Sequence, residues 1–192
     1  NNKEAARLFH LSAVQGYSEA QRFLGEFHLY GQGVPQNLEE GVRWLLMAAN
    51  QENDLAQLML GHCFMMGIGV KTDALESVRW FRRADANRNA EAIVGLGVCY
   101  LNGSVVTRDV HEAKSLFQRA ANMKEPSAHY YLGLCHCGVS RIRKNMIRAF
   151  HCFETGAMYD DSKAMKQLAL CYRDGLGVPK NAEKAEHWTS RA

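Results

Sequence analysis

Residues 56–70 read AQLMLGHCFMMGIGV, and the same pattern returns along the chain at a constant spacing. Cysteine stands at 63, 99, 135 and 171, a step of 36 residues each time. Alanine returns at 20, 56, 92, 128 and 164, and leucine at 24, 60, 96, 132 and 168. A fixed period of this length is the signature of a repeat protein. The chain therefore contains five in-phase copies of one unit.

Each unit is predicted to form two helices. In the second unit, Asp54 is a candidate N-cap of a first helix that runs to about Met66. A pair of glycines follows, which supplies the positive φ angles of a tight turn. Asp73, with Glu76 three residues later as its capping partner, predicts the start of a second helix that ends near Asn87.

Two amphipathic helices cannot bury their apolar faces alone, whereas stacked units share one continuous core. We therefore expect one all-α repeat domain over residues 1–192. The predicted repeats are 17–52, 53–88, 89–124, 125–160 and 161–192, and residues 1–16 supply a lone second helix, about Lys3 to Gln15. Glycine recurs inside the first helix at 25, 61, 97 and 133, at a cost of about 1 kcal/mol each. That recurrence predicts close packing by the second helix or by the next repeat.

Composition narrows the functional classes. The chain has 192 residues, of which 47% are hydrophobic and 22% charged, and its net charge is +3. These values are typical of a globular protein and exclude a disordered one. No apolar run approaches the roughly 20 residues of a membrane span, so we expect no membrane insertion. The charge is too small to indicate nucleic-acid binding. Because the chain opens at Asn1 without methionine or a signal peptide, we expect a domain excised from a longer protein.

The repeat resembles a known family. Ala20-Gln21-Arg22-Phe23-Leu24-Gly25, then Gly31-Gln32-Gly33-Val34-Pro35, then Trp44 and Ala48-Ala49 is similar to the Sel-1-like repeat, a relative of the tetratricopeptide repeats. The fifth unit, with Gly175-Leu176-Gly177-Val178-Pro179, matches nearly as well. The third unit lacks the second glycine and the fourth lacks both, so we expect their turns to be distorted.

This resemblance implies a right-handed α/α solenoid and a class of role rather than a reaction. Similar proteins are adaptors and scaffolds in degradation complexes, signalling and host contact. A curved solenoid offers a groove lined by the first helices, which suits an extended peptide or an amphipathic helix. We therefore expect a protein partner.

The groove prediction rests on positions that vary between repeats at helical spacing. The candidate partner-binding residues are Phe23, Glu26, Tyr30, Met59, His62, Met66, Val98, Asn102, Tyr131, Leu134, Gln167 and Leu170. Methionine and aromatic side chains are common at recognition surfaces. Two alternatives are that these side chains pack along the inner curve, or that residues outside this sequence cover them.

A second candidate site is the basic turn of the divergent fourth unit, formed by Arg141, Arg143, Lys144 and Arg148. It would fit an acidic patch on a partner or a second copy of the chain. The alternative is a solvated loop.

The in-phase cysteines are interpreted as buried free thiols. Stacked helices lie about 8–10 Å apart, whereas a disulfide needs Cα atoms about 4.4–6.8 Å apart. Phe27 occupies the same position in the first full unit, which indicates a site for apolar bulk. Free thiols favour a reducing compartment, the cytosol or the mitochondrion, and the secretory lumen remains an alternative.

Cys135, His136, Cys137, His151 and Cys152 form the densest group of metal-ligand residue types. Most of them occupy positions that are apolar in the other repeats, and Cys-x-Cys lacks zinc-finger spacing. We therefore predict no metal and no cofactor. A Cys137–Cys152 bridge is a further alternative. The histidines are dispersed and no nucleophile elbow or phosphate loop is present, so we predict no enzyme.

Two functional hypotheses remain. The first is a protein-interaction adaptor that uses its groove. The second is an assembly module, a possible homo-oligomer, in which the repeat ends or the variable face drive self-association. Neither end carries an obvious polar capping helix, which keeps the second hypothesis open.

Overall fold

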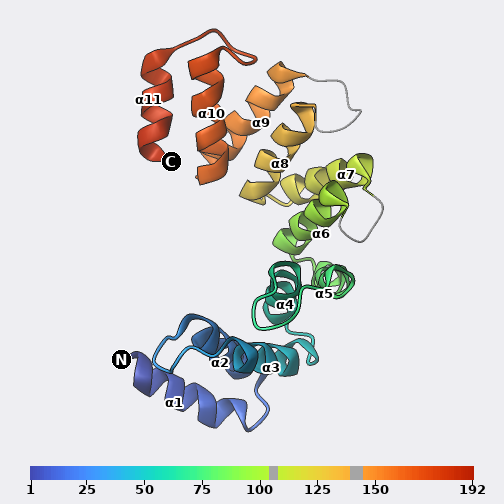
Figure 1. The fold of residues 1–192 in the computed structure, drawn as a ribbon, viewed down its shortest axis with the longest axis vertical. Helices are drawn as coiled ribbons and strands as arrows, with labels where there is room; N and C mark the ends of the chain where they lie inside the picture. Colours follow the sequence, from blue (N-terminus) through green and yellow to red (C-terminus); the bar gives the residue numbers. More distant parts are fainter. Residues whose placement is uncertain (104–107, 139–144) are drawn as a thin grey trace. The chain divides into compact units, whose positions relative to one another are not determined.

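The structure is a computed structural model that describes residues 1–103, 108–138 and 145–192. Over these ranges it contains eleven helices and no strand, which confirms the all-α prediction (Figure 1). The helices are α1 (Asn2–Ala13), α2 (Ser18–Tyr30), α3 (Leu38–Ala49), α4 (Asp54–Met66), α5 (Ala74–Ala86), α6 (Ala90–Asn102), α7 (Val110–Asn122), α8 (Pro126–His136), α9 (Met146–Met158), α10 (Ser162–Asp174) and α11 (Ala182–Arg191).

The even-numbered helices are the first helices of the repeats and are called A helices here; the odd-numbered ones are B helices. The chain forms two compact units, residues 1–96 and 97–192, and the division falls within α6. In unit 1, α2 packs against α1 and α3, and α4 packs against α3 and α5. In unit 2, α8 packs against α7 and α9, and α10 packs against α9 and α11. These A helices therefore each lie between two B helices.

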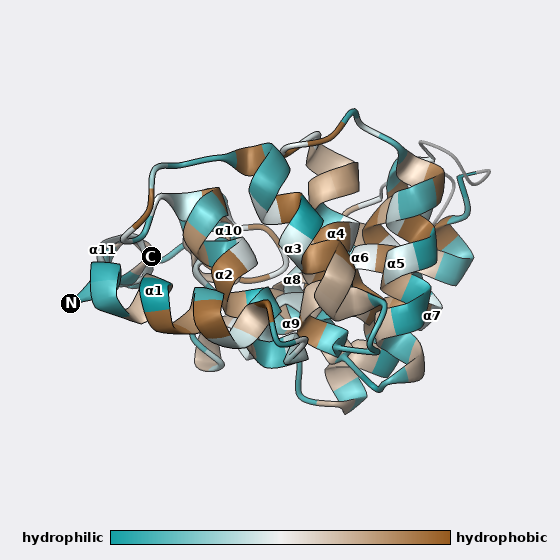
Figure 2. Cartoon of the chain, turned by 90° about the horizontal axis from the view of Figure 1, so that it is seen from below, coloured by the Kyte–Doolittle hydropathy of each residue, from teal (hydrophilic) through white to brown (hydrophobic). Residues whose placement is uncertain are grey.

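This placement explains the different polarity of the two helix types. The A helices α4 and α6 are predominantly hydrophobic, because neighbours cover them on two sides. The B helices α5 and α7 alternate hydrophobic and hydrophilic residues along their length (Figure 2). Only one face of these B helices is therefore available to the core.

An asparagine or aspartate caps every B helix at the equivalent position of the repeat: Asn1, Asn37, Asp73, Asp109, Asn145 and Asn181. Asp73 accepts a hydrogen bond from the backbone N–H of Glu76 at 3.1 Å, as predicted. The reciprocal bond does not form, because the N–H of Asp73 donates to the carbonyl of Phe64 at 3.0 Å. The Glu76 carboxylate pairs with Arg79 instead.

The predicted cap of α4 was wrong by one residue. Asn53, not Asp54, caps the helix, and its side-chain oxygen accepts from the N–H of Ala56 at 3.0 Å. The carboxylate of Asp54 accepts a hydrogen bond from Asn89 at 3.0 Å. Asp54 is therefore the first helical residue, and its side chain ties the second repeat to the third.

The paired glycines build the turn between the A and B helices. Gly67 ends α4 with φ of 76°, and Gly69 has φ of 68°. A Cβ on Gly69 would come within 2.3 Å of the carbonyl oxygen of Leu38 at the start of α3. Glycine is thus needed there for two reasons, its backbone conformation and its close approach to the preceding B helix.

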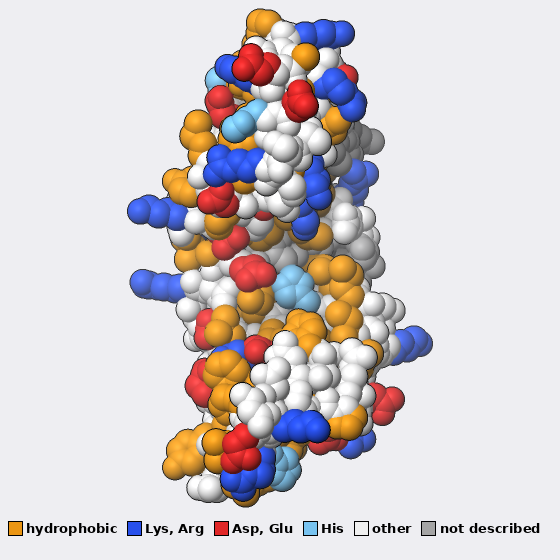
Figure 3. Space-filling model, turned by 90° about the vertical axis from the view of Figure 1, so that its left-hand side faces the viewer, with side chains coloured by type: hydrophobic (Ala, Val, Ile, Leu, Met, Phe, Trp, Pro, Cys, Tyr) orange, Lys and Arg blue, Asp and Glu red, His pale blue; other side chains and the backbone are white. Residues whose placement is uncertain are grey.

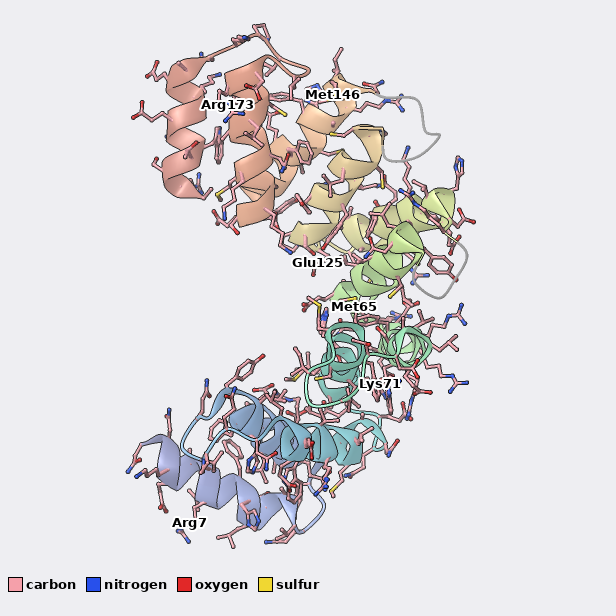
Figure 4. All side chains as sticks on the ribbon, in the orientation of Figure 1. Arg7, Met65, Lys71, Glu125, Met146 and Arg173 are labelled. Carbon is pink, nitrogen blue, oxygen red and sulfur yellow. The ribbon has the colours of Figure 1, made fainter. Side chains whose placement is uncertain are left out.

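The fifth repeat builds the same contact. A Cβ on Gly177 would lie 2.1 Å from the carbonyl oxygen of Met146, the first residue of α9 (Figure 4). The equivalent residues of the third and fourth repeats are Val105 and Arg141, which lie outside the described residues. The predicted distortion of those two turns therefore stays a prediction.

The helix glycines have the predicted packing reason. A Cβ on Gly61 would come within 2.4 Å of the ring of Phe81 on α5, and Gly97 faces Phe117 on α7 at the same 2.4 Å. Gly95 approaches Phe81 as well, at 2.7 Å. The rings of Phe81 and Phe117 are fully buried. The absence of side-chain atoms on the A helix is what admits an aromatic ring from the B helix.

Candidate protein-binding site

In unit 1 the predicted groove residues lie on α2 and α4, and none of them is buried. Tyr30 and Met66 occupy equivalent places as the last residues of these helices, with exposed fractions of 65% and 67%. The remaining four are half-buried: Phe23, Glu26, Met59 and His62.

Phe23 and Glu26 belong to an intramolecular cluster around a buried arginine. The ring of Phe23 stacks on Phe9 of α1 with centroids 4.8 Å apart. The guanidinium carbon of Arg22 lies 3.8 Å from the centroid of Phe23. Arg22, which is only 7% exposed, forms ion pairs with Glu19 at 3.1 Å and with Glu26. This cluster was not predicted from the sequence, although the spacing of the two glutamates around Arg22 is a signal for it.

His62 and Met59 also have contacts within unit 1. The His62 ring meets Phe81 edge-on with centroids 5.1 Å apart, and its Nε2 lies 3.8 Å from Oε1 of Glu91. Met59 packs against the core cluster that contains Leu60. The exposed part of the predicted face in unit 1 is therefore concentrated at Tyr30 and Met66.

In unit 2, Asn102 is exposed and the other predicted groove residues are half-buried: Val98, Tyr131, Leu134, Gln167 and Leu170. The Tyr131 ring stacks on Phe117 of α7 with centroids 5.0 Å apart, and Tyr130 meets it edge-on at the same distance. Leu134 packs against the core shared by α9 and α10.

The A-helix position that residues 23, 95 and 131 share in the repeat faces the preceding B helix. Phe23 meets Phe9, Gly95 meets Phe81, and Tyr131 meets Phe117, each pair being one step of the same interface. The alternative that these side chains pack within the solenoid therefore holds for Phe23 and Tyr131. The recurring ring at 81, 117 and 153 was the signal in the sequence for this contact.

The basic turn is described only at its end. Arg141, Arg143 and Lys144 lie outside the described residues. Arg148 is exposed in the first turn of α9, and its backbone N–H donates to the side chain of Asn145 at 3.0 Å.

The in-phase cysteines are buried, as predicted, and none of the six cysteines forms a disulfide in the structure. Burial raises the pKa of Cys63, Cys135 and Cys171 to about 11. Among the described residues, no group of three or more His, Cys, Asp or Glu side chains is arranged to hold a metal ion. Nor does any helix in the described ranges have both the length and the hydrophobicity to cross a membrane.

Two surface hollows lie beside α1 and α10. One, of about 500 Å³, lies between α1, α2 and α3 and is lined by His10, His28 and Trp44 among others. Another, of about 290 Å³, lies between α10 and α11 beside Leu170. On the face drawn in Figure 3, acidic and basic side chains are interspersed with hydrophobic ones. This mixture suits a protein partner better than a uniformly charged polymer.

Known proteins share both the repeat and the fold. The family model of the Sel1 repeat matches residues 18–53, 54–84, 90–124, 126–158 and 162–192. The chain belongs to the Sel1 repeat family. Each matched range begins one residue after the predicted repeat. Sel1 repeat proteins generally act as protein-interaction modules, and their fold is a non-catalytic scaffold.

Solved structures extend the likeness over the whole chain. A Sel1 repeat protein from Oxalobacter formigenes is 30% identical, with a TM-score of 0.94, over 100% of this chain and 76% of its own. A protective antigen of uropathogenic Escherichia coli with an SLR fold is 24% identical, with a TM-score of 0.77, over 98% of this chain and 40% of its own. A Sel1 repeat protein from Klebsiella pneumoniae is 20% identical, with a TM-score of 0.66, over 96% and 90%. No curated protein matches the chain.

Proposed function

We propose that this Sel1 repeat chain is a non-enzymatic adaptor that binds a peptide or helix of a partner protein on its A-helix face. The observation that carries the proposal is the pair Tyr30 and Met66. These side chains lie at equivalent positions of successive repeats in unit 1 and are 65% and 67% exposed. Covering one such side chain contributes about 1.5–3 kcal/mol, which is enough for a recognition anchor.

The adaptor proposal is tested with purified chain and a peptide-display library. A selected peptide is expected to bind through Tyr30 and Met66, so Tyr30→Glu combined with Met66→Glu should weaken its binding by about tenfold or more. The matched control is Met47→Glu combined with Leu75→Glu, which places the same charges on exposed apolar positions of the B helices α3 and α5. Equal losses in both double variants would show that the A-helix face is not the binding site.

The alternative function is an assembly module. It is favoured by the exposed apolar residues at α1, where Leu8, Leu11 and the C-cap residue Val14 are 54%, 46% and 59% exposed. If α1 drives self-association, the mass in sedimentation rises with concentration, and Leu8→Glu with Leu11→Glu abolishes the rise. A mass that stays monomeric over the same concentrations would reject this alternative.

We further propose a reducing intracellular compartment, the cytosol or the mitochondrion, with the secretory lumen as the alternative. The support is chemical: six cysteines without a disulfide are typical of a compartment where disulfide formation is not favoured. Fractionation of the source cells, with an antibody against this chain, tests the location directly. Recovery from the secretory lumen would reject the proposal.

A further inference from the structure

The second repeat shows how the repeat normally packs at the place that corresponds to the hollow between α1, α2 and α3. An apolar cluster occupies that place and includes side chains from α3, α4, the following turn and α5: Val42, Leu46, Phe64, Val70 and Trp80. Val42 and Trp80 are buried, and the other three pack against the buried core. Apolar bulk from three helices thus meets there.

In the first repeat, the residues 36 positions earlier line the hollow of about 500 Å³ instead: Ala6, His10, His28, Val34 and Trp44. Alanine replaces a valine, and histidines replace a leucine and a phenylalanine, so the first repeat has less apolar bulk at the same place. The resulting volume is within the range of about 300–1,000 Å³ that is typical of ligand pockets.

The combination of these replacements distinguishes the first repeat. Histidine alone does not, because the fourth repeat has His136 at the position of His28. The fourth repeat has the larger Phe150 at the position of a neighbouring B-helix residue, Ala6, after four repeat steps. Giving up packing at one accessible place while the rest of the repeat is kept is typical of a functional site.

The hollow has aromatic walls and one orphaned polar atom. The ring of His10 meets Trp44 edge-on with centroids 6.0 Å apart. Nδ1 of His28 is buried and has no hydrogen-bond partner in the part of the chain that the structure describes. Buried polar atoms usually have partners. Because the His28 ring lines the hollow, a turn about its Cβ–Cγ bond can bring this nitrogen to a polar atom of a ligand.

The charge around the hollow is predominantly positive. Lys3 and Arg7 of α1 both line it and are exposed. Arg7 pairs with Glu4 at 2.7 Å, whereas Lys3 forms no ion pair within the described ranges. Glu40 is the acidic residue among those that line the hollow, and Arg43 pairs with it at 3.3 Å. The ammonium group of Lys3 is therefore available to an anionic ligand.

We propose that this hollow binds an aromatic side chain of a partner peptide, and that Lys3 pairs with an acidic residue beside that side chain. The rings of His10 and Trp44 supply the edges and faces that aromatic side chains prefer as neighbours. Charge complementarity with Lys3 selects an acidic segment. The proposal rests on the adaptor function and adds a second contact, made by residues other than Tyr30 and Met66.

The test is an NMR titration of the ¹⁵N-labelled chain, in which the indole N–H signal of Trp44, assigned with Trp44→Phe, is the reporter. The probe is a capped peptide of Gly and Ser with Asp-Phe-Asp at its centre. The reference peptides carry Asp-Ala-Asp or Asn-Phe-Asn instead. The probe should shift the Trp44 signal and bind at least about tenfold more tightly than Asp-Ala-Asp. Equal binding of the probe and either reference would overturn the proposal.

The charge contribution is measured against the Asn-Phe-Asn reference. At low salt the probe is expected to bind about threefold or more tightly than this peptide, and the preference should fall as salt is raised. A preference that does not change with salt would show that Lys3 does not pair with the peptide.

The decisive variant fills the hollow with the side chains of the second repeat, as Ala6→Val, His10→Leu and His28→Phe. Affinity for the probe should fall by about tenfold or more. The thermal midpoint should be unchanged or higher, because the same side chains pack together in the second repeat and filling a cavity is commonly stabilising. A filled variant that keeps the affinity of the parent chain would overturn the proposal.

A surface variant tests the charge without altering the packing. Lys3→Glu introduces the residue that the second repeat has at this position, Glu39, and should weaken binding of the probe by about threefold or more. Lys71→Glu, in the exposed turn after α4 (Figure 4), changes the net charge equally but does not line the hollow, so it should alter affinity less than about twofold. Equal losses in the two variants would assign the effect to net charge, and the proposal would be wrong.

Two further outcomes separate this proposal from its neighbours. If free phenylacetate displaces the probe at a lower concentration than the unlabelled peptide does, the hollow is a small-molecule site and the proposal of a peptide contact is wrong. Display-selected peptides that depend on Tyr30 and Met66 would uphold the adaptor function even when the Asp-Phe-Asp peptide fails to bind.

Discussion

The ring of Phe153 on α9 lies so close to Gly133 on α8 that a Cβ on Gly133 would come within 2.3 Å of it. The fifth repeat has Ala169 in place of this glycine, and the facing residue there is Thr189. Both of those residues line the hollow between α10 and α11. In the fifth repeat, a larger residue on the A helix thus accompanies a smaller facing residue on the B helix. The two facing positions of the repeat therefore fill the same space.

We expect Gly133→Ala to lower the free energy of unfolding by up to about 2 kcal/mol. Overpacking against the Phe153 ring costs about 1–3 kcal/mol, which exceeds the gain of about 1 kcal/mol in helix propensity. The opposite exchange, Ala169→Gly, meets no ring and should cost only about the 1 kcal/mol of propensity. Urea unfolding measures both, and a stabilised Gly133→Ala variant would contradict the packing argument.

Arg22 gives a prediction about buried charge. Arg22→Ala removes the buried stem and leaves Glu26, whose side chain is 25% exposed, without its cation, so it should destabilise the chain by about 2 kcal/mol. Arg22→Leu introduces leucine, the residue that the second repeat has at the equivalent position, Leu58. Because well-packed apolar replacements of buried ion pairs are near neutral, this variant should change the stability by less than about 1 kcal/mol. Thermal unfolding compares the two variants. Equal losses would mean that the charge itself, and not the packing of its stem, stabilises unit 1.

Non-glycine residues in left-handed conformation recur after the B helices: Glu52, Arg88, Lys124 and Asp160. Lys124 has φ of 65°. Lys124→Val should destabilise by about 1–2 kcal/mol, because a β-branched side chain is strained there. Lys124→Gly should leave the thermal midpoint unchanged or slightly raised, since relief of strain offsets the entropy of glycine. A similar loss in both variants would show that the lysine side chain, not the backbone, matters.

Stability should fall at alkaline pH because of the buried thiols. Burial raises the pKa of Cys63, Cys135 and Cys171 to about 11, against an ordinary value of 9.0. The folded state therefore keeps its protons while the unfolded state loses them, so this stability is present below pH 9.0 and is lost as pH rises towards about 11.

The alkaline effect is measured as thermal midpoints of the parent chain and of Cys171→Ala across that pH range. Cys171→Ala is less stable at neutral pH, because it leaves a cavity, but its midpoint should fall less steeply with pH. Parallel curves for the two proteins would assign the alkaline loss to other groups, such as lysines.

The internal period made much of this protein predictable. Because one backbone geometry repeats every 36 residues, a single turn with Gly67 and Gly69 predicts the turn with Gly175 and Gly177. The same period identified the buried cysteine column and the close packing at Gly61. It also placed the exposed residues Tyr30 and Met66 on equivalent helix ends.

Contacts between helices were less accessible to sequence reasoning. Whether Phe23 faces solvent or Phe9 depends on how two helices rotate against each other, which the order of residues does not state.

By itself, then, the sequence determined the repeat, its two helices and the residues that need glycine or apolar bulk, because those follow from local backbone geometry and a constant period. Only the tertiary structure decided which exposed-looking side chains, such as Phe23 and Tyr131, have partners inside the chain. These contacts depend on the stacking of helices from neighbouring repeats, and small rotations of a helix change which side chains can meet.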